Sequence, residues 1–245
     1  MEERKGIYFV SDVHIGADIG DPAEREDRFV RFLKSIPADT KAIYLLGDIW
    51  DFWYEYSEFI PKDGARVTAA LLNLIHDGVE VHFFPGNHDM WVRDFFGKNG
   101  ISLHSQPYFC NIGGKEFCLG HGDIIGGTDI GYRVLHWVYT SPITQFIFRL
   151  MDPRFLFWIT RKWFRLSRNS HKPFEFDPDR QKIVHWAREV DKKSKVDYFV
   201  FGHFHCDVRL TLESGAGFYI MGDWVNASPY YFFDGTSLQA KTFEG

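Results

Sequence analysis

The sequence contains few cysteines, no long apolar run and no excess of basic charge. The 245 residues include three cysteines at irregular spacing, which argues against a disulfide scaffold and fits a reducing compartment. No stretch of about 18 apolar residues runs without a charge, so we expect no transmembrane helix. The apolar run at residues 6–10 is too short for a signal peptide. These absences predict a cytoplasmic protein.

The overall composition is that of a globular domain. Hydrophobic residues make up 45% of the chain and charged residues 25%, which is enough apolar material for a core. The net charge of −5 argues against a nucleic-acid partner, because proteins that bind nucleic acids present an excess of basic residues. We expect a single domain over residues 1–245.

Aromatic residues are abundant and concentrate in one region. Residues 132–176 contain twelve of them, with eight Lys or Arg and only two acids, so this region carries +6 and the rest of the chain −11. Its helical pattern, broken at Asp152-Pro153, interrupts a series of strands and predicts a helical insertion over residues 124–180. Two interpretations stay open. The basic amphipathic helices meet phosphate or anionic lipid, or the aromatics are only the core of the insertion and the charges a solvated face.

Short apolar runs alternate with amphipathic helical patterns in the first half of the chain. Apolar residues recur at helical spacing from Pro22 to Ile36, and a second helical pattern at 67–75 ends before Gly78. Later runs lie close together around turn sequences and predict antiparallel strands. The fold class is therefore α/β or α+β. The predicted strands are residues 7–10, 42–46, 79–84, 117–119, 198–201, 208–212, 217–221, 230–233 and 238–243.

Each of the first five predicted strands is followed by a loop with potential metal ligands. If the five strand ends share one edge of a sheet, these side chains gather at one site. Carboxylate, amide and imidazole groups without a thiolate disfavour a structural zinc cluster and suit catalytic Mn, Fe or Zn. Seven ligands predict two ions with a shared carboxylate, an arrangement that serves phosphoryl displacement. The predicted ligands are Asp12, His14, Asp48, Asn87, His121, His203 and His205.

These loops resemble the signature blocks of the calcineurin-like metallophosphoesterases. The resemblance implies a β-sandwich flanked by helices and two divalent ions, for which we expect Mn, with Fe, Zn or Mg as alternatives. It assigns one ion to Asp12, His14, Asp48 and His205, and the other to Asp48, Asn87, His121 and His203. The matching blocks are Asp12-x-His14, Gly47-Asp48, Gly86-Asn87-His88-Asp89, Gly120-His121 and Gly202-His203-x-His205.

Further residues resemble the UDP-2,3-diacylglucosamine diphosphatase family of the lipid A pathway. The resemblance implies hydrolysis of UDP-2,3-diacylglucosamine to UMP and 2,3-diacylglucosamine 1-phosphate beneath a helical lid. It also implies a nucleotide-linked lipid as partner and peripheral contact with an anionic membrane, at the cytosolic face of the inner membrane. The residues that carry it are Gly47-Asp48-Ile49-Trp50-Asp51-Phe52-Trp53, His121-Gly122-Asp123, Thr128-Asp129, Gly131-Tyr132, Asn169-Ser170 and Gly222-Asp223-Trp224.

The substrate contacts follow from the same resemblance. Many family members carry an Arg that would contact the substrate phosphate where this chain has His88. By position, Asp129 and Ser170 resemble substrate-contacting residues. The family's further polar and Lys contacts do not line up, and Arg168 or Lys172 could replace them.

The chemistry expected of the third loop concerns three consecutive residues. We expect Asn87, with the ions, to neutralise charge on the phosphoryl oxygens, and His88 to stabilise that charge or protonate the leaving oxygen. Asp89 either orients His88 or caps its own loop.

Other functions stay open. The same metal chemistry could act on another nucleoside-diphosphate lipid, a cyclic nucleotide or a phosphoprotein. A scaffold protein without catalysis is disfavoured because no ligand is missing, and a nuclease because the acidic remainder of the chain lacks a basic track.

Overall fold

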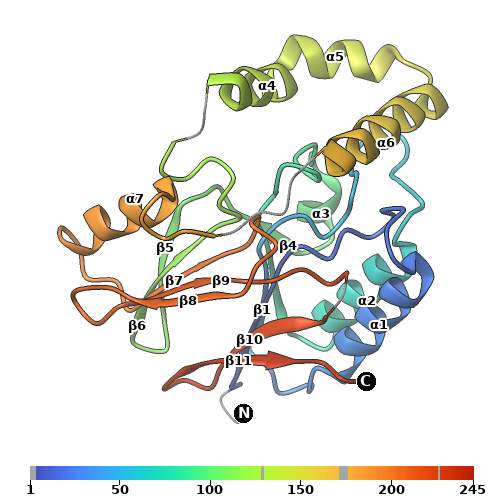
Figure 1. Ribbon diagram of the computed structural model, residues 1–245. Coiled ribbons are helices and arrows are strands. Elements are labelled where there is room, and N and C mark those ends of the chain that lie inside the picture. The colour runs from blue at the N-terminus through green and yellow to red at the C-terminus, as the bar shows by residue number, and fades with distance from the viewer. Residues whose placement is uncertain (1–3, 128–129, 171–175, 226) are drawn as a thin grey trace.

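Two β-sheets pack face to face and carry helices on their outer faces (Figure 1). The computed structural model describes residues 4–127, 130–170, 176–225 and 227–245, and the side chains of residues 167–170 are not described. Within these residues the chain forms eleven strands and seven helices. The expected sandwich flanked by helices is therefore confirmed.

The first sheet has six strands in the order β11-β10-β1-β2-β3-β4. The strands from β1 to β4 run parallel, whereas β10 is antiparallel to both β1 and β11. The sheet contains β1 (Ile7–Val10), β2 (Ala42–Leu45), β3 (Glu80–Phe83), β4 (Ile101–Leu103), β10 (Pro229–Phe233) and β11 (Leu238–Thr242).

The second sheet has five strands in the order β5-β6-β7-β9-β8. Its centre is parallel, and both edge strands are antiparallel to their neighbours. The predicted antiparallel pairing of the last four runs is confirmed, since β8 pairs with β9 and β10 with β11. The sheet contains β5 (Tyr108–Ile112), β6 (Lys115–Leu119), β7 (Tyr198–Phe201), β8 (Val208–Thr211) and β9 (Gly217–Ile220).

The predicted helices begin and end close to the residues that the sequence indicates. The first starts at Pro22 behind Asp21, whose carboxylate accepts a hydrogen bond from the Glu24 amide at 3.0 Å. The break predicted at Asp152-Pro153 separates α5 from α6. The helices are α1 (Pro22–Ser35), α2 (Ala65–His76), α3 (Phe95–Lys98), α4 (Ile130–Thr140), α5 (Pro142–Leu150), α6 (Pro153–Ser170) and α7 (Lys182–Asp191).

Alternation along the strands builds the layers of the sandwich. In β1, Ile7 and Phe9 face the second sheet, where Phe9 stacks on Phe117 with ring centroids 5.6 Å apart. Tyr8 and Val10 face the opposite way, toward α1 and α2. Because neighbouring side chains of a strand point to opposite faces, each short strand supports two cores at once.

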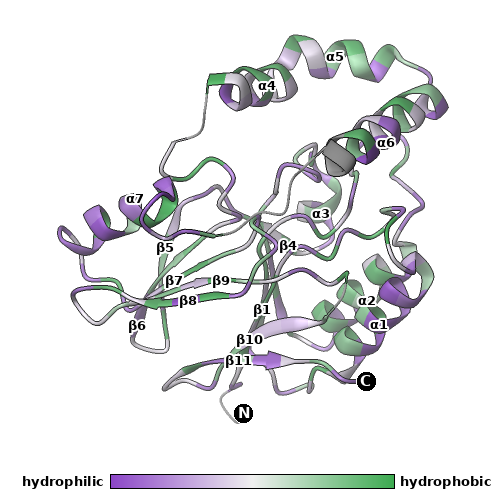
Figure 2. Cartoon of the chain, viewed as in Figure 1, coloured by the Kyte–Doolittle hydropathy of each residue, from purple (hydrophilic) through white to green (hydrophobic). Residues whose placement is uncertain are grey.

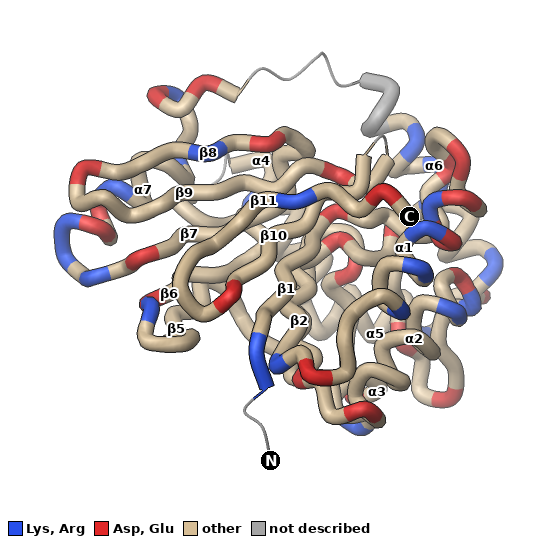
Figure 3. Tube along the Cα trace, turned by 90° about the horizontal axis from the view of Figure 1, so that it is seen from below, with Lys and Arg blue, Asp and Glu red and all other residues tan. Residues whose placement is uncertain are grey.

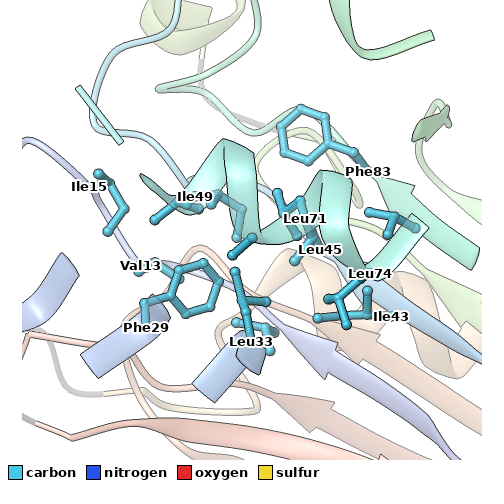
Figure 4. Close-up of a cluster of buried hydrophobic side chains, with 14 of the residues drawn as sticks. Val13, Ile15, Phe29, Leu33, Ile43, Leu45, Ile49, Leu71, Leu74 and Phe83 are labelled. Carbon is cyan, nitrogen blue, oxygen red and sulfur yellow. The ribbon is translucent and has the colours of Figure 1, made fainter. Parts of the chain in front are cut away.

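The core beneath α1 and α2 holds the first three strand ends in place. Leu33 of α1 and Leu71 of α2 pack on Ile43 and Leu45 of β2, and all four side chains are buried (Figure 4). Burial of such a side chain contributes about 2 kcal/mol. On the outer face of the second sheet, Ile183, Val184 and Ala187 of α7 occupy the equivalent place. Few charged residues interrupt the strands, and most lie on helices and turns (Figure 3).

The helices α4, α5 and α6 lie beyond the strands, at one end of the sandwich (Figure 1). Neither α4 nor α5 contains a buried residue. Figure 2 shows strongly apolar residues mixed with hydrophilic ones along all three helices. None of the described helices combines the length and the apolarity needed to cross a membrane.

A pair of histidines between β3 and β4 makes stability depend on pH. His82 Nδ1 lies 2.9 Å from His104 Nε2, and burial lowers the pKa of both rings below the ordinary 6.5. The unfolded chain therefore binds protons that the folded chain excludes. This contribution to stability is complete above pH 6.5 and is lost as the pH falls through the lower folded pKa.

The His104→Phe variant removes one of these titrations and keeps a ring against Phe84. We expect urea midpoints of the metal-free protein to fall less between neutral and mildly acidic pH in this variant than in the wild type. Parallel pH profiles for the two proteins would contradict the assignment.

Candidate metal centre and active site

The five predicted ligand loops meet at one end of the sandwich. The expectation that they share one edge of a single sheet is wrong. Three of the loops follow β1, β2 and β3 of the first sheet, and two follow β6 and β7 of the second. They converge because the parallel strands of the two sheets are packed with their carboxyl ends together. The site therefore lies across the sandwich rather than along one sheet.

Five of the predicted ligands have a left-handed backbone. The φ angles are 54° for Asp12, 52° for His14, 53° for Asp48, 72° for His203 and 53° for His205. Such a conformation costs a non-glycine residue on the order of 1–3 kcal/mol and persists only where its surroundings impose it. The concentration of strained residues at these loops marks them as a functional site.

Three of the ligands form a first cluster. Single ligand atoms of Asp12, His14 and His205 all lie within 4.8 Å of one another. The Asp12 Oδ1 atom is 3.8 Å from His14 Nε2 and 3.7 Å from His205 Nε2. The two imidazole rings stack with centroids 4.9 Å apart. The nitrogens and the carboxylate thus surround a common point.

A second cluster lies beside the first. It consists of Asp48, His121 and His203, again with ligand atoms within 4.8 Å. The Asp48 Oδ2 atom is 3.3 Å from His121 Nε2 and 4.0 Å from His14 Nε2, so this carboxylate stands between the clusters. Asn87 Oδ1 lies 3.3 Å from His121 Nε2. All seven predicted ligands are therefore brought together, with Asp48 in the bridging position.

The donor atoms suit divalent cations. Among the described residues, Asp12 Oδ1 and His14 Nε2 are buried without a hydrogen-bond partner and face the first cluster. A buried polar atom left unpaired is costly, and a cation at the first cluster would satisfy both atoms. Glycines make the close packing possible, because a Cβ at Gly86 would overlap the Asp48 carboxylate and one at Gly202 the Asp12 carboxylate.

The pKa shifts show how strongly the charges interact. Burial opposes ionisation of Asp12, yet the neighbouring histidines outweigh it and lower the pKa to about 2. Burial likewise opposes protonation of His14, but Asp12 and Asp51 raise its pKa to about 10. Burial and the nearby His121 lower the pKa of His203 to about 4. Asp12 thus remains ionised at neutral pH, as a metal ligand must.

The carboxylates also tie the loops together through backbone amides. Asp12 Oδ2 accepts a hydrogen bond from the His203 amide at 2.9 Å, and Asp48 Oδ1 accepts one from the His88 amide at 2.8 Å. Asp89 accepts four, from the amides of Gly86, Asp48, Ile49 and Trp50 at 2.8–3.3 Å. Of the two roles considered for Asp89, the structure therefore supports the loop cap.

Asp51, rather than Asp89, is the partner of His88. His88 Nδ1 lies 3.0 Å from the Asp51 carbonyl oxygen and 3.3 Å from its carboxylate, which is also 3.4 Å from His14 Nδ1. Asp51 stands three residues after Asp48, and no local pattern predicts its role. The same holds for Asp223, whose carboxylate is 3.2 Å from His205 Nδ1. Both acids orient an imidazole through the nitrogen that faces away from its cluster.

The helix α6 lies against this site. The Phe164 ring packs on the His88 ring with centroids 4.1 Å apart. Arg168 and Ser170 follow on the last turn of α6, but their side chains are not described, and Asp129 and Lys172 lie outside the described residues. Of the predicted substrate contacts, only Asn87 and His88 therefore have a described position at the site.

Aromatic side chains of the core anchor the three helices. Trp91 Nε1 donates a hydrogen bond to the Tyr139 carbonyl at 2.7 Å, and the Tyr54 hydroxyl donates one to the Gln145 carbonyl at 2.9 Å. Phe52 meets Phe157 edge to face at 4.8 Å. Arg161 forms an ion pair with Asp63. The helices are thus fixed to the loops that carry Asp48 and His88.

Comparison with known proteins agrees with this geometry. The family model of the calcineurin-like phosphoesterases matches residues 6–207. The chain belongs to this family. Family membership makes it a metal-dependent hydrolase of phosphoric esters or anhydrides, and proteins of this family use dinuclear metal centres.

Several curated relatives of this calcineurin-like phosphoesterase carry the same name. A "UDP-2,3-diacylglucosamine hydrolase" of Porphyromonas gingivalis is 30% identical, with 98% of each chain covered. The protein of the same name from Neisseria gonorrhoeae is 29% identical over 89% of this chain and 90% of its own. Among solved structures, a dimetal phosphatase from Danio rerio is 15% identical with a TM-score of 0.46, over 99% of this chain and 100% of that one.

Replacing Asp89 tests its role as a loop cap. Asp89→Ala leaves four buried amides without their acceptor, and each such loss costs about 1–3 kcal/mol when water does not replace it. We expect the free energy of unfolding in urea, with EDTA present, to fall by about 3 kcal/mol or more. His88→Ala is the matched control and should cost less than about 1 kcal/mol. Equal destabilisation by the two substitutions would contradict this role.

Proposed function

We propose that the protein hydrolyses the pyrophosphate bond of UDP-2,3-diacylglucosamine in lipid A biosynthesis. The products are UMP and 2,3-diacylglucosamine 1-phosphate. The observation that carries this proposal is the contact of an aromatic helix with the active site: Phe164 covers His88 beside two metal-ligand clusters. The shared name of the full-length relatives supports the same substrate.

We assign two divalent cations, in first place Mn, to the two clusters. Such ions polarise the phosphoryl oxygens and make a water molecule nucleophilic at neutral pH. Asp12, His14 and His205 hold one ion, His121, His203 and Asn87 the other, and Asp48 both. Imidazole and carboxylate donors suit Mn, Fe and Zn.

The remaining residues orient the substrate and move a proton. His88 contacts the phosphoryl group and protonates the leaving oxygen, and Asp51 holds its Nδ1 side in place. Asn87, whose amide lies beside His121, helps to stabilise the charge on the phosphoryl oxygens. We assign Asp129, Ser170, Arg168 and Lys172 to the sugar and phosphate of the substrate.

Residues 124–180 form a lid within the single domain, and its outer face meets the membrane. Trp137 of α4 is 68% exposed and Leu150 of α5 is 73% exposed. Monomeric proteins rarely expose so many large apolar side chains side by side, and Arg and Lys on the same helices suit anionic lipid. The protein then works in the cytoplasm at the cytosolic face of the inner membrane, without a nucleic-acid partner.

The reaction is tested by the release of UMP. With Mn²⁺ the wild-type protein should release UMP from UDP-2,3-diacylglucosamine, and EDTA should abolish the release. Asp48→Ala should lower turnover by at least about 10³-fold, because both ions lose a ligand. The control Asp234→Asn, in an exposed turn, should retain wild-type activity.

The outcomes separate the main alternatives. Turnover of soluble diesters or of another nucleoside-diphosphate lipid, without release of UMP from UDP-2,3-diacylglucosamine, would refute the substrate and keep the metal chemistry. Full metal content and turnover in Asp48→Ala would refute the dinuclear scheme.

Membrane contact is tested by co-sedimentation with vesicles of phosphatidylethanolamine and phosphatidylglycerol. We expect binding at low salt that weakens as salt rises, since screening acts on the basic residues. The double variant Trp137→Ser/Leu150→Ser should bind several-fold more weakly. Phe109→Ser on β5, which removes an exposed ring elsewhere, is the control. Equal binding by both variants would exclude this face as the contact.

A further inference from the structure

A cavity of about 350 Å³ adjoins the metal-ligand clusters on one flank. Its lining includes His203 of the second cluster and the loop Gly122-Asp123 that follows His121. His88 and Phe164 stand on another flank, where His88 meets His14 of the first cluster with ring centroids 4.9 Å apart. The first cluster is therefore bordered by the aromatic helix α6, and the second cluster by an open cavity.

Hydrogen bonds fix the walls of this cavity. The Asp123 carboxylate accepts bonds from Gln106 Nε2 at 2.6 Å and from the Tyr132 hydroxyl at 2.8 Å. Gln106 Oε1 accepts the Gly122 amide at 2.8 Å. Tyr132 belongs to α4, so one side chain links the helix to the loop of a metal ligand. The cavity is thus built before any ligand enters.

The floor is equally close-packed. Gly126, with a φ of +78°, lies so near the Lys182 carbonyl that an added Cβ would meet its oxygen at 2.5 Å. The start of α7 is thereby held against the loop that leads into α4. Its residues Gln181 and Lys182 face the same cavity as Tyr132 and Phe204.

The lining chemistry differs from that of the apolar helices. Tyr132 and Phe204 offer aromatic rings on which a base can stack. The Gln181 amide offers an N–H donor and an oxygen acceptor, which complement a carbonyl oxygen and the N–H of the imide edge of a pyrimidine. Lys182 supplies positive charge for a phosphate, whereas Arg180 forms an ion pair with Asp177. Such a surface suits a nucleotide and offers little to an acyl chain.

We propose that this cavity binds the nucleoside monophosphate half of the substrate. The inference rests on the proposed function and adds a direction to it. The nucleotide lies on the His203 flank and the acylated sugar on the flank of His88 and Phe164, so the pyrophosphate spans the two clusters. The uridine ring stacks between α4 and the loop after β7, and Lys182 pairs with the nucleotide phosphate.

UMP itself is the probe, used with the full chain and Mg²⁺ in place of Mn²⁺. Calorimetry should detect UMP binding that Lys182→Gln and Phe204→Leu each weaken about tenfold, the loss expected for one charge-assisted or stacking contact. Lys192→Gln, at the far end of the same helix, is the matched control and should bind UMP as the wild type does. Binding of glucosamine 1-phosphate should be unchanged in all three variants.

Kinetics provide the second readout. The ratio of kcat/KM for the nucleotide substrate to kcat/KM for bis(p-nitrophenyl) phosphate should fall about tenfold in Lys182→Gln, mainly through KM. Unaltered UMP binding in both cavity variants, or weakened binding of glucosamine 1-phosphate alone, would overturn the proposal. Neither result touches the proposed function, which instead fails if wild-type protein releases no UMP from the lipid.

Discussion

Three carboxyl groups are buried where the loops of two sheets cross, and the arrangement of the site depends on the hydrogen bonds that compensate their burial. Asp12, Asp48 and Asp89 are at most 1% exposed. Each accepts a hydrogen bond from a backbone amide in the loop after another strand. The His203 amide donates to Asp12, the His88 amide to Asp48, and the Asp48 amide to Asp89. Burying an ionised carboxylate is costly unless such partners surround it. The same requirement that assembles the loops also gathers the histidines.

The strain at the ligand loops is carried by ordinary packing behind them. The left-handed backbone of five ligand residues destabilises the folded state by several kcal/mol in total, at about 1–3 kcal/mol for each residue. The hydrophobic cores under α1, α2 and α7 stabilise the strands from which these loops leave. A stiff scaffold thus holds a geometry that the loops would not adopt by themselves.

The local features were predictable from sequence, whereas the long-range pairings were not. A polar ligand directly after an apolar run identified Asp12, Asp48 and His121, because the end of a buried strand leaves few other roles for such a residue. The division of these loops between two sheets depends on strand order, which no local pattern encodes. Asp51 and Asp223 were missed for the same reason, since an acid is recognised as a histidine partner only when the ring beside it is known. The helix α7 went unpredicted although Ile183, Val184 and Ala187 are spaced for burial, because it is short and follows a long polar stretch.

The anchoring of α4 and α5 has a consequence for how this segment can diverge. Trp91 and Tyr54 donate hydrogen bonds to the backbone carbonyl oxygens of Tyr139 and Gln145. A backbone carbonyl is present whichever side chain the residue carries. The hydrogen bonds that hold α4 and α5 in place therefore do not depend on the side chains of their outer surface. Related chains can differ in that surface while the distance between these helices and the ligand loops stays constant.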